Sequence, residues 1–120
     1  MVIIVKSNIF GINMANLLLK KKAIVTICNL NTKNIPYFSS KADIVIVAVG
    51  KKYLVKKNWI KQNAVVIDVG INKEGKKVYG DVDPSVMEVA GKITPVPYGV
   101  GPITNVMLLV NTMKSFRSSK

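Results

Sequence analysis

Residues 2–19 read VIIVKSNIFGINMANLLL. The stretch begins with a continuous apolar run, Val2–Val5, continues through a polar turn to Gly11, and then has apolar residues at helical spacing. A buried strand, a tight turn and a helix form the start of a nucleotide-binding βαβ unit, where the turn N–H groups and the helix dipole favour a phosphate anion. A full dinucleotide fingerprint has three glycines, and Gly11 is the only one here, so the turn alone is weak evidence.

Further apolar runs predict the other strands. Residues 23–28 are rich in β-branched side chains and predict a second strand. Residues 44–49 are apolar at consecutive positions, and residues 64–70 repeat this pattern with one acid, Asp68, near the end; such runs are typical of strands buried on both faces of a parallel sheet. Both runs reach a Val-Gly pair, so we expect neighbouring strands whose carboxyl ends share the edge where open α/β sheets bind ligands. Residues 78–80 and 93–94 predict two short extended pieces.

Helical connections are expected between these strands. The sequence predicts a brief helix within residues 35–41, a helical turn around Trp59, and a helix from Pro84 to Ala90 that ends at Gly91. Residues 94–102 are proline-rich and predict a stiff, extended loop, followed by a last helix from Ile103. This alternation predicts an α/β fold, a Rossmann-like, doubly wound, mostly parallel sheet in a single domain over residues 1–120.

Composition excludes several kinds of site. The chain has no histidine and one cysteine, Cys28, which excludes histidine acid–base catalysis, a Cys-rich zinc site and a disulfide within the chain. The net charge is +12, but only Arg117 of the 18 basic residues is an arginine, and the lysines are scattered. We interpret this as a solvated lysine-rich surface, with a basic nucleic-acid-binding module as the less favoured alternative.

The chain shows no targeting or membrane signal. Its first residues lack the basic region and cleavage site of a signal peptide, and the uncharged stretch at residues 93–113 is interrupted by prolines and glycines. We therefore expect a cytoplasmic protein that makes no membrane contact.

Few residues are candidates for chemistry. Asp81 and Asp83 are interpreted as helix-capping residues rather than a metal pair, because no third carboxylate lies nearby in the sequence. Asp68 either faces a ligand or is a hydrogen-bonded carboxylate at a strand end. Cys28 is interpreted as a small buried residue rather than a nucleophile. We expect no catalytic constellation and no metal site within these residues.

The end of the second predicted strand bears on cofactor choice. NAD-preferring domains usually place an acidic residue there to bind the ribose diol. This chain instead has Asn29, Asn31 and Thr32, followed by the cation Lys33. Without a carboxylate to repel a 2′-phosphate, the site favours NADP, with NAD as the alternative.

Four motifs carry a resemblance to a known family: residues 42–50, residues 66–72, residues 80–83, and residues 94–97 together with 99–104. In these motifs the chain resembles the C-terminal NAD(P)-binding domain of bifunctional methylenetetrahydrofolate dehydrogenase/methenyltetrahydrofolate cyclohydrolase. The resemblance implies an enzyme of one-carbon metabolism. Such enzymes oxidise 5,10-methylenetetrahydrofolate by hydride transfer to NAD(P) and hydrolyse the methenyl product to 10-formyltetrahydrofolate.

The resemblance also implies ten cofactor-binding residues. They fall into a phosphate group, a group near the 2′-phosphate and a nicotinamide group: Lys6, Ser7 and Gly11; Asn29, Asn31 and Thr32; Val49, Gly50, Ile71 and Thr94.

Three departures from the family pattern bear on function. Val5 stands where the family's turn has its first glycine, and we expect its side chain to obstruct the phosphates. Tyr98 stands where the family has a glycine and is expected to intrude on the folate cleft. We also expect the N-terminal folate domain, with its Tyr-x-x-x-Lys catalytic pair, to be absent, so this chain is not competent alone.

These departures leave an alternative open, a degenerate, non-catalytic remnant of the family. If the chain is instead a working cofactor domain, tetrahydrofolate is a substrate only with a catalytic domain supplied elsewhere. The apolar residues Ile103, Met107 and Val110 are then expected to form an exposed patch that favours a homodimer or a partner chain.

Overall fold

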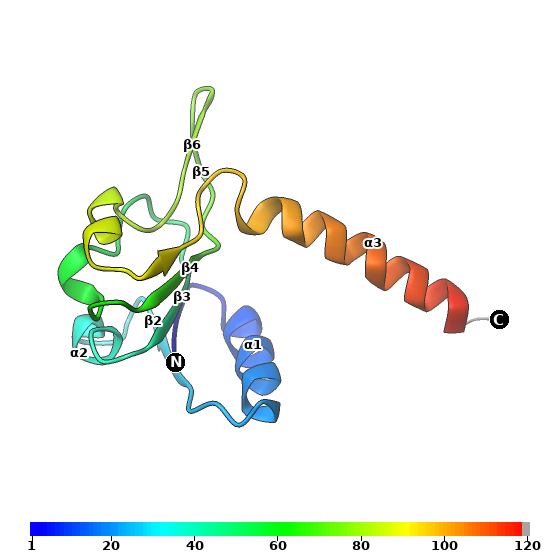
Figure 1. Ribbon diagram of the computed structural model, residues 1–120, viewed down its shortest axis with the longest axis horizontal. Helices are drawn as coiled ribbons and strands as arrows, with labels where there is room; N and C mark the ends of the chain where they lie inside the picture. The colour runs from blue at the N-terminus through cyan, green and yellow to red at the C-terminus, as the bar shows by residue number, and fades with distance from the viewer. Residues whose placement is uncertain (119–120) are drawn as a thin grey trace.

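A five-stranded parallel sheet forms the centre of the computed structural model, which describes residues 1–118 (Figure 1). The strand order is β2-β1-β3-β4-β7, and every neighbouring pair is parallel. The bounds are Val2–Val5 for β1, Thr26–Asn29 for β2, Ile44–Ala48 for β3, Val65–Asp68 for β4 and Lys92–Ile93 for β7. The predicted α/β class, with a mostly parallel sheet, is confirmed, and the carboxyl ends of all five strands lie at one edge.

The helices and a hairpin complete the chain. The α-helices are α1 (Asn8–Lys20), α2 (Ile35–Ser39) and α3 (Val100–Ser118). Two 3₁₀ helices, η1 (Lys57–Trp59) and η2 (Pro84–Glu88), and an antiparallel hairpin of β5 (Asn72–Glu74) and β6 (Lys77–Tyr79) account for the rest.

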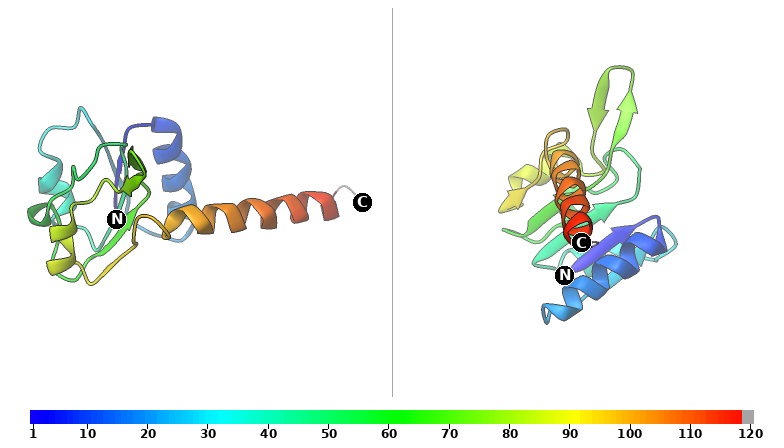
Figure 2. Two further views of the ribbon diagram at one scale, coloured as in Figure 1. Left: turned by 90° about the horizontal axis from the view of Figure 1, so that it is seen from above. Right: turned by 90° about the vertical axis from the view of Figure 1, so that its right-hand side faces the viewer.

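Both faces of β1 are covered, which explains its continuous apolar run. In β1, Ile3 and Val5 belong to the apolar cluster that includes Ala15 of α1, whereas Val2 and Ile4 belong to the cluster on the side of α2 and the 3₁₀ helices. Figure 2 shows α1 on one side of the sheet and these other helices on the opposite side. All four β1 side chains are buried. Burial of an aliphatic side chain of this size contributes about 1.5–3 kcal/mol, so the central strands stabilise the fold from both sides.

Three strands are shorter than predicted, and one of them, β4, covers only Val65–Asp68 of the predicted residues 64–70. The second strand begins at Thr26 rather than at residue 23, because the Ala23 N–H donates to the Leu18 carbonyl and closes the end of α1. The third ends at Ala48 rather than at residue 49, because the Val49 N–H donates to a side chain, Asp81, instead of continuing the strand ladder.

Two predicted helices also differ. The helix after Asp83 is a 3₁₀ helix that ends at Glu88, since Val86 and Val89 donate their N–H groups three residues back. The last helix begins at Val100, ahead of its predicted start, and includes Pro102 in its first turn. Proline is tolerated there because the N–H groups of a first turn have no partner within the helix.

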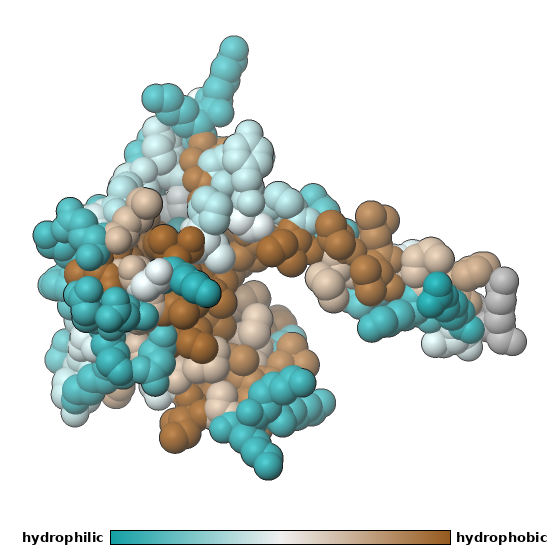
Figure 3. All heavy atoms as spheres, viewed as in Figure 1, coloured by the Kyte–Doolittle hydropathy of each residue, from teal (hydrophilic) through white to brown (hydrophobic). Residues whose placement is uncertain are grey.

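Helix α3 extends away from the rest of the domain (Figures 1 and 2). None of its described residues is buried, and Ile103, Met107 and Val110 are exposed, which confirms the predicted apolar patch. Hydrophobic side chains continue along this helix (Figure 3). Even so, no helix among residues 1–118 combines the length and the apolar character needed to cross a membrane.

Candidate functional site

The predicted cofactor-binding residues gather at the carboxyl edge of the sheet. Lys6 and Ser7 follow β1, and Asn29 ends β2, with Asn31 and Thr32 just beyond it. The nicotinamide group continues along the same edge, with Val49 and Gly50 after β3, Ile71 after β4 and Thr94 after β7. Because all five strands are parallel, these segments share one rim, which is the binding position in open α/β sheets.

The turn after β1 suits an anion. Ser7 has extended backbone and is the N-cap of α1, but its side chain makes no capping hydrogen bond. The first N–H groups of a helix have no partner within the helix and carry its positive end. Lys6 is exposed beside them, and its own N–H donates to the Ala48 carbonyl at 3.1 Å. The turn can therefore offer backbone donors, a hydroxyl and an ammonium group to a phosphate.

Gly11 allows α1 to approach the sheet closely. A Cβ at Gly11 would lie 3.0 Å from Cγ2 of Val5 and 3.3 Å from Cγ2 of Ile27. The Val5 side chain is fully buried between β1 and α1. The expectation that it projects into the phosphate turn is therefore wrong. The alternation along β1 explains this, because Val5 shares the inner face with Ile3.

The loop after β2 is closed by its own hydrogen bonds. The Asn29 N–H donates to Oγ1 of Thr32 at 3.0 Å, and the Asn31 N–H donates to Oδ1 of Asn29 at 2.9 Å. These bonds hold three uncharged polar side chains at the end of the strand, and Lys33 follows in an exposed position. This rim segment therefore carries no negative charge.

Asp81 supports the loop after β3. Its Oδ2 accepts from the Val49 N–H at 2.7 Å and from the Gly50 N–H at 3.0 Å, and its Oδ1 accepts from Nδ2 of Asn72 at 2.8 Å. The carboxylate is fully buried. The predicted capping role of Asp81 is wrong, because the side chain satisfies distant N–H groups rather than a helix end.

Asp83, in contrast, caps the start of η2, as predicted. Its Oδ1 accepts from the Ser85 N–H at 2.9 Å, and its Oδ2 accepts from Nζ of Lys56 at 2.9 Å. The Ser85 N–H, together with Lys56, lowers the pKa of Asp83 to about 2.

Asp68 is a hydrogen-bonded carboxylate at the end of β4. It accepts from the N–H groups of Gly70, Asp81 and Val82 at 2.9–3.1 Å. Burial raises its pKa, and the three N–H donors partly offset that rise. The Asp68 N–H donates to Oγ1 of Thr94 at 2.8 Å, which links the ends of β4 and β7. Of the two predictions for Asp68, the structural one is the better description.

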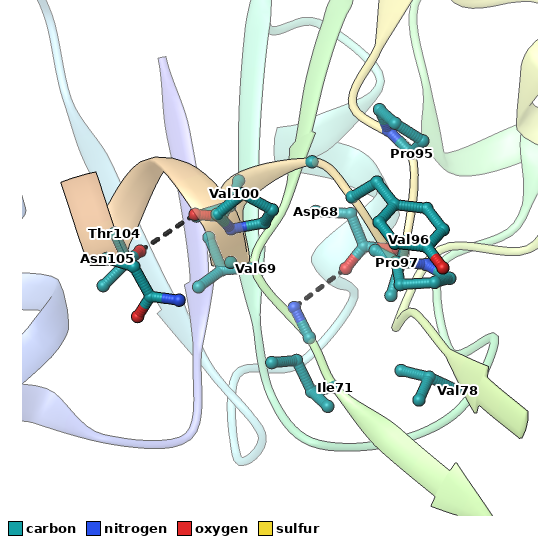
Figure 4. A pocket seen from close by; sticks show the side chains of 15 residues that line it. Asp68, Val69, Ile71, Val78, Pro95, Val96, Pro97, Val100, Thr104 and Asn105 are labelled. Atoms are coloured by element: carbon teal, nitrogen blue, oxygen red, sulfur yellow. Dashed lines mark hydrogen bonds between the residues drawn. The ribbon is translucent and has the colours of Figure 1, made fainter. Parts of the chain in front are cut away.

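A pocket of about 580 Å³ lies beside this rim (Figure 4). Asp68, Ile71 and the Pro95–Pro97 segment line it, together with the start of α3. Tyr98 also lines the pocket, is 85% exposed and has a φ of +76°, a backbone conformation that favours glycine. Tyr98 therefore lies beside a pocket, and its intrusion on a folate cleft stays a prediction.

Two side chains have no role at the rim. Cys28 is buried, as predicted, and this burial raises the pKa of its thiol. Val49 is 1% exposed and packs in the core, so Gly50, which is exposed, is the residue of this pair that is accessible at the rim. Within residues 1–118, no three acidic or cysteine side chains come together as a metal site.

Comparison with known proteins identifies the fold and its family. The family model described as "Tetrahydrofolate dehydrogenase/cyclohydrolase, NAD(P)-binding domain" matches residues 1–120. The chain belongs to this family. Within it, the bifunctional protein FolD of Thermus thermophilus is 44% identical over 114 residues, which cover 95% of this chain and 40% of the relative. FolD of Dechloromonas aromatica is 53% identical over 116 residues, covering 95% of this chain and 41% of the relative.

Solved structures of the family agree. The bifunctional FolD enzyme of Campylobacter jejuni superimposes with a TM-score of 0.92 at 43% identity, covering 99% of this chain and 43% of that one. The Trypanosoma brucei enzyme, solved with NADP cofactor and inhibitor, superimposes with a TM-score of 0.88 at 39% identity, covering 98% and 43%. The chain thus spans about 40% of the length of the curated relatives cited here.

Sequence reasoning missed the contacts of Asp81. The one available signal was the position of the glycines, since Gly70 and Gly80 each stand opposite a buried aspartate. Those pairings join residues from separate segments and become visible only in the folded chain.

Proposed function

We propose that this chain binds NADP at the carboxyl edge of its sheet and forms the cofactor-binding part of a methylenetetrahydrofolate dehydrogenase/cyclohydrolase. The observation that carries the proposal is the gathering of all the predicted phosphate, ribose and nicotinamide segments on one rim. Membership of an NAD(P)-binding family supports it, as does a relative solved with NADP.

The residues of the rim fit this cofactor. The exposed Lys6 and the unpaired N–H groups at the start of α1 suit the pyrophosphate, and Gly11 lets the helix approach. The uncharged loop at residues 29–32 and the nearby Lys33 favour a 2′-phosphate, so NADP is preferred and NAD is the alternative. NADP, when bound, would supply the hydride acceptor. The role of this chain would be to bind the cofactor and orient its nicotinamide ring.

The folate chemistry needs a second part. The family's catalytic Tyr-x-x-x-Lys pair belongs to its N-terminal folate domain, whereas this chain matches the NAD(P)-binding domain. We propose that a folate-binding domain, on this or another chain, meets the 580 Å³ pocket and the exposed apolar face of α3. Association of two copies through α3 is the competing arrangement, and sedimentation velocity of the purified chain distinguishes them. The cytoplasmic location stays a prediction, tested by fractionation of the source cell.

Titration with NADPH and NADH tests cofactor binding. We expect saturable binding of NADPH, followed by its fluorescence, and weaker binding of NADH. Lys6→Ala removes one cation from the phosphate turn and should weaken NADPH binding about tenfold, equivalent to about 1.4 kcal/mol. Lys41→Ala is the matched control, because Lys41 precedes the amino end of β3 at the opposite edge of the sheet.

Absence of saturable NADPH binding below millimolar concentration would overturn the proposal in favour of a non-catalytic remnant. Equal weakening by Lys6→Ala and Lys41→Ala would indicate non-specific charge attraction instead. The nucleic-acid alternative has little structural support, because hydrophilic side chains form several separate groups on the face shown rather than one stripe (Figure 3). The salt dependence of DNA binding tests it.

A further inference from the structure

Two buried aspartates interlock beneath the rim. A Cβ at Gly70 would overlap the carboxyl group of Asp81, and a Cβ at Gly80 would overlap that of Asp68. Each glycine thus makes room for the aspartate of the other segment. We call these four residues, Asp68, Gly70, Gly80 and Asp81, the aspartate clasp.

The clasp uses both oxygens of each carboxylate. Asp81 accepts from the N–H groups of Val49 and Gly50 through Oδ2, and from Asn72 through Oδ1. Val49 is the first residue beyond β3, so its N–H has left the strand ladder and depends on this carboxylate. A buried N–H without an acceptor is costly, so Asp81 determines where the backbone of residues 49–50 lies.

Asp68 extends the same network across the sheet. It holds the N–H groups of Asp81 and Val82 at 3.1 Å, which keeps the segment after the hairpin against β4. Its own N–H donates to Thr94 at 2.8 Å, at the end of β7. The two aspartates therefore connect the carboxyl ends of β3, β4 and β7.

This network supports only one half of the rim. The order β2-β1-β3-β4-β7 changes direction between β1 and β3, and a dinucleotide lies across such a point. The phosphate turn and residues 29–32 follow β1 and β2, on the adenosine side. The nicotinamide half then lies over β3, β4 and β7. Within residues 1–118, no hydrogen bond of the clasp involves residues 6–11 or 29–32.

We infer that Asp81, held in place by Asp68, is a positioning residue for the nicotinamide half of the cofactor. The inference rests on the proposed function. Asp81 is fully buried and acts through the backbone of Val49 and Gly50, whose N–H groups it holds just beyond the end of β3. The adenosine half is bound by segments that the clasp does not touch.

Binding of the whole cofactor and of its adenosine half separates positioning from general stability. The affinities of NADPH and adenosine 2′,5′-bisphosphate are measured by titration into the wild type and into Asp81→Ala. Asp81→Ala should weaken NADPH binding at least about tenfold, whereas the bisphosphate should bind within about twofold of the wild type. Asp81→Asn keeps an acceptor oxygen for residues 49–50 and should restore most of the NADPH affinity.

Asp43→Asn is the matched control, because Asp43 lies just before the amino end of the same strand, β3, and is paired with Lys61 in solvent. It should leave both affinities unchanged. If Asp81→Ala does not fold, the same two affinities are measured for Asn72→Ala instead. It removes one partner of the Asp81 carboxylate, together with the hydrogen bond from Asn72 to the Tyr79 carbonyl, and should weaken NADPH binding about threefold with no effect on the bisphosphate.

The outcomes distinguish this inference from the proposed function. A wild type that binds neither probe overturns the proposed function, and the positioning role falls with it. The positioning role alone is overturned if the wild type binds both probes and Asp81→Ala either weakens the affinity for both by the same factor or changes neither affinity. Loss confined to NADPH, with recovery in Asp81→Asn, supports the role.

Discussion

Replacement of Gly70 by alanine is the most demanding test of the packing described above. Gly70 follows β4 and is buried, and an added Cβ would occupy the position of the Asp81 carboxyl group. The nearest atoms all belong to this buried carboxyl group, which hydrogen bonds hold in place, so no flexible side-chain end can move aside. Gly70→Ala must therefore displace Asp81 from its site.

The expected cost follows from the bonds of Asp81. Its carboxylate accepts three hydrogen bonds, from Val49, Gly50 and Asn72. A hydrogen bond to a charged group contributes about 1.5–3 kcal/mol, and a buried N–H left unpaired costs about 1–3 kcal/mol. Loss of one or two of these bonds predicts a decrease of about 1.5–6 kcal/mol in the free energy of unfolding. That is a large part of the roughly 5–15 kcal/mol typical of a domain.

Urea denaturation, monitored by circular dichroism, measures this change directly. Gly101→Ala is the matched control, since Gly101 has no atom near its missing Cβ and lies in the first turn of α3. The control should change the free energy of unfolding by less than about 1 kcal/mol. The argument is refuted if Gly70→Ala unfolds within about 1 kcal/mol of Gly101→Ala.

Three further changes test individual residues. The folded pKa of Asp83, about 2, lies below the unfolded value of about 3.9. Its stabilising effect is therefore present above pH about 4 and lost towards pH 2, so urea denaturation should show the stability difference between the wild type and Asp83→Asn disappearing over that range. Tyr98→Gly removes a strained positive φ and should raise the free energy of unfolding by about 1 kcal/mol, whereas a clear decrease would show that the tyrosine is stabilising. The raised pKa and burial of Cys28 predict slow alkylation of the native chain at pH about 8 and at least about a hundredfold faster alkylation in urea, and equal rates would contradict its buried position.

The sheet was largely predictable because its strands carry a local signal. Consecutive apolar residues in β1, β3 and β4 require burial on both faces, and this requirement alone indicates a parallel sheet covered by helices. The cap at Asp83 was predictable for the same reason, since the residues that it satisfies lie within the next turn. The ends of the strands were less predictable, because side chains from distant segments compete for their N–H groups.

The direction of the Val5 side chain shows another limit of pattern reading. Comparison of this turn with the family pattern pairs residue types one by one. On that basis, Val5 in place of a glycine suggests an obstructed phosphate site. In the folded chain, Val5 continues the inner face of β1 and fills space against α1 opposite Gly11. The alternation of β1 contained this information, but only the position of α1 shows that the inner face is closed.

The sequence by itself determined the α/β class, the order of the segments, and the polar residues that follow each strand. These features depend on neighbouring residues, whose hydrophobicity and turn preferences act over a few positions. The tertiary structure alone decided that Asp81 supports residues 49–50, which lie 31–32 positions earlier, and that Asp68 holds the segment at 81–82. Burial keeps these carboxylates from water, so within residues 1–118 their partners are N–H groups, most of which folding brings to them from other segments.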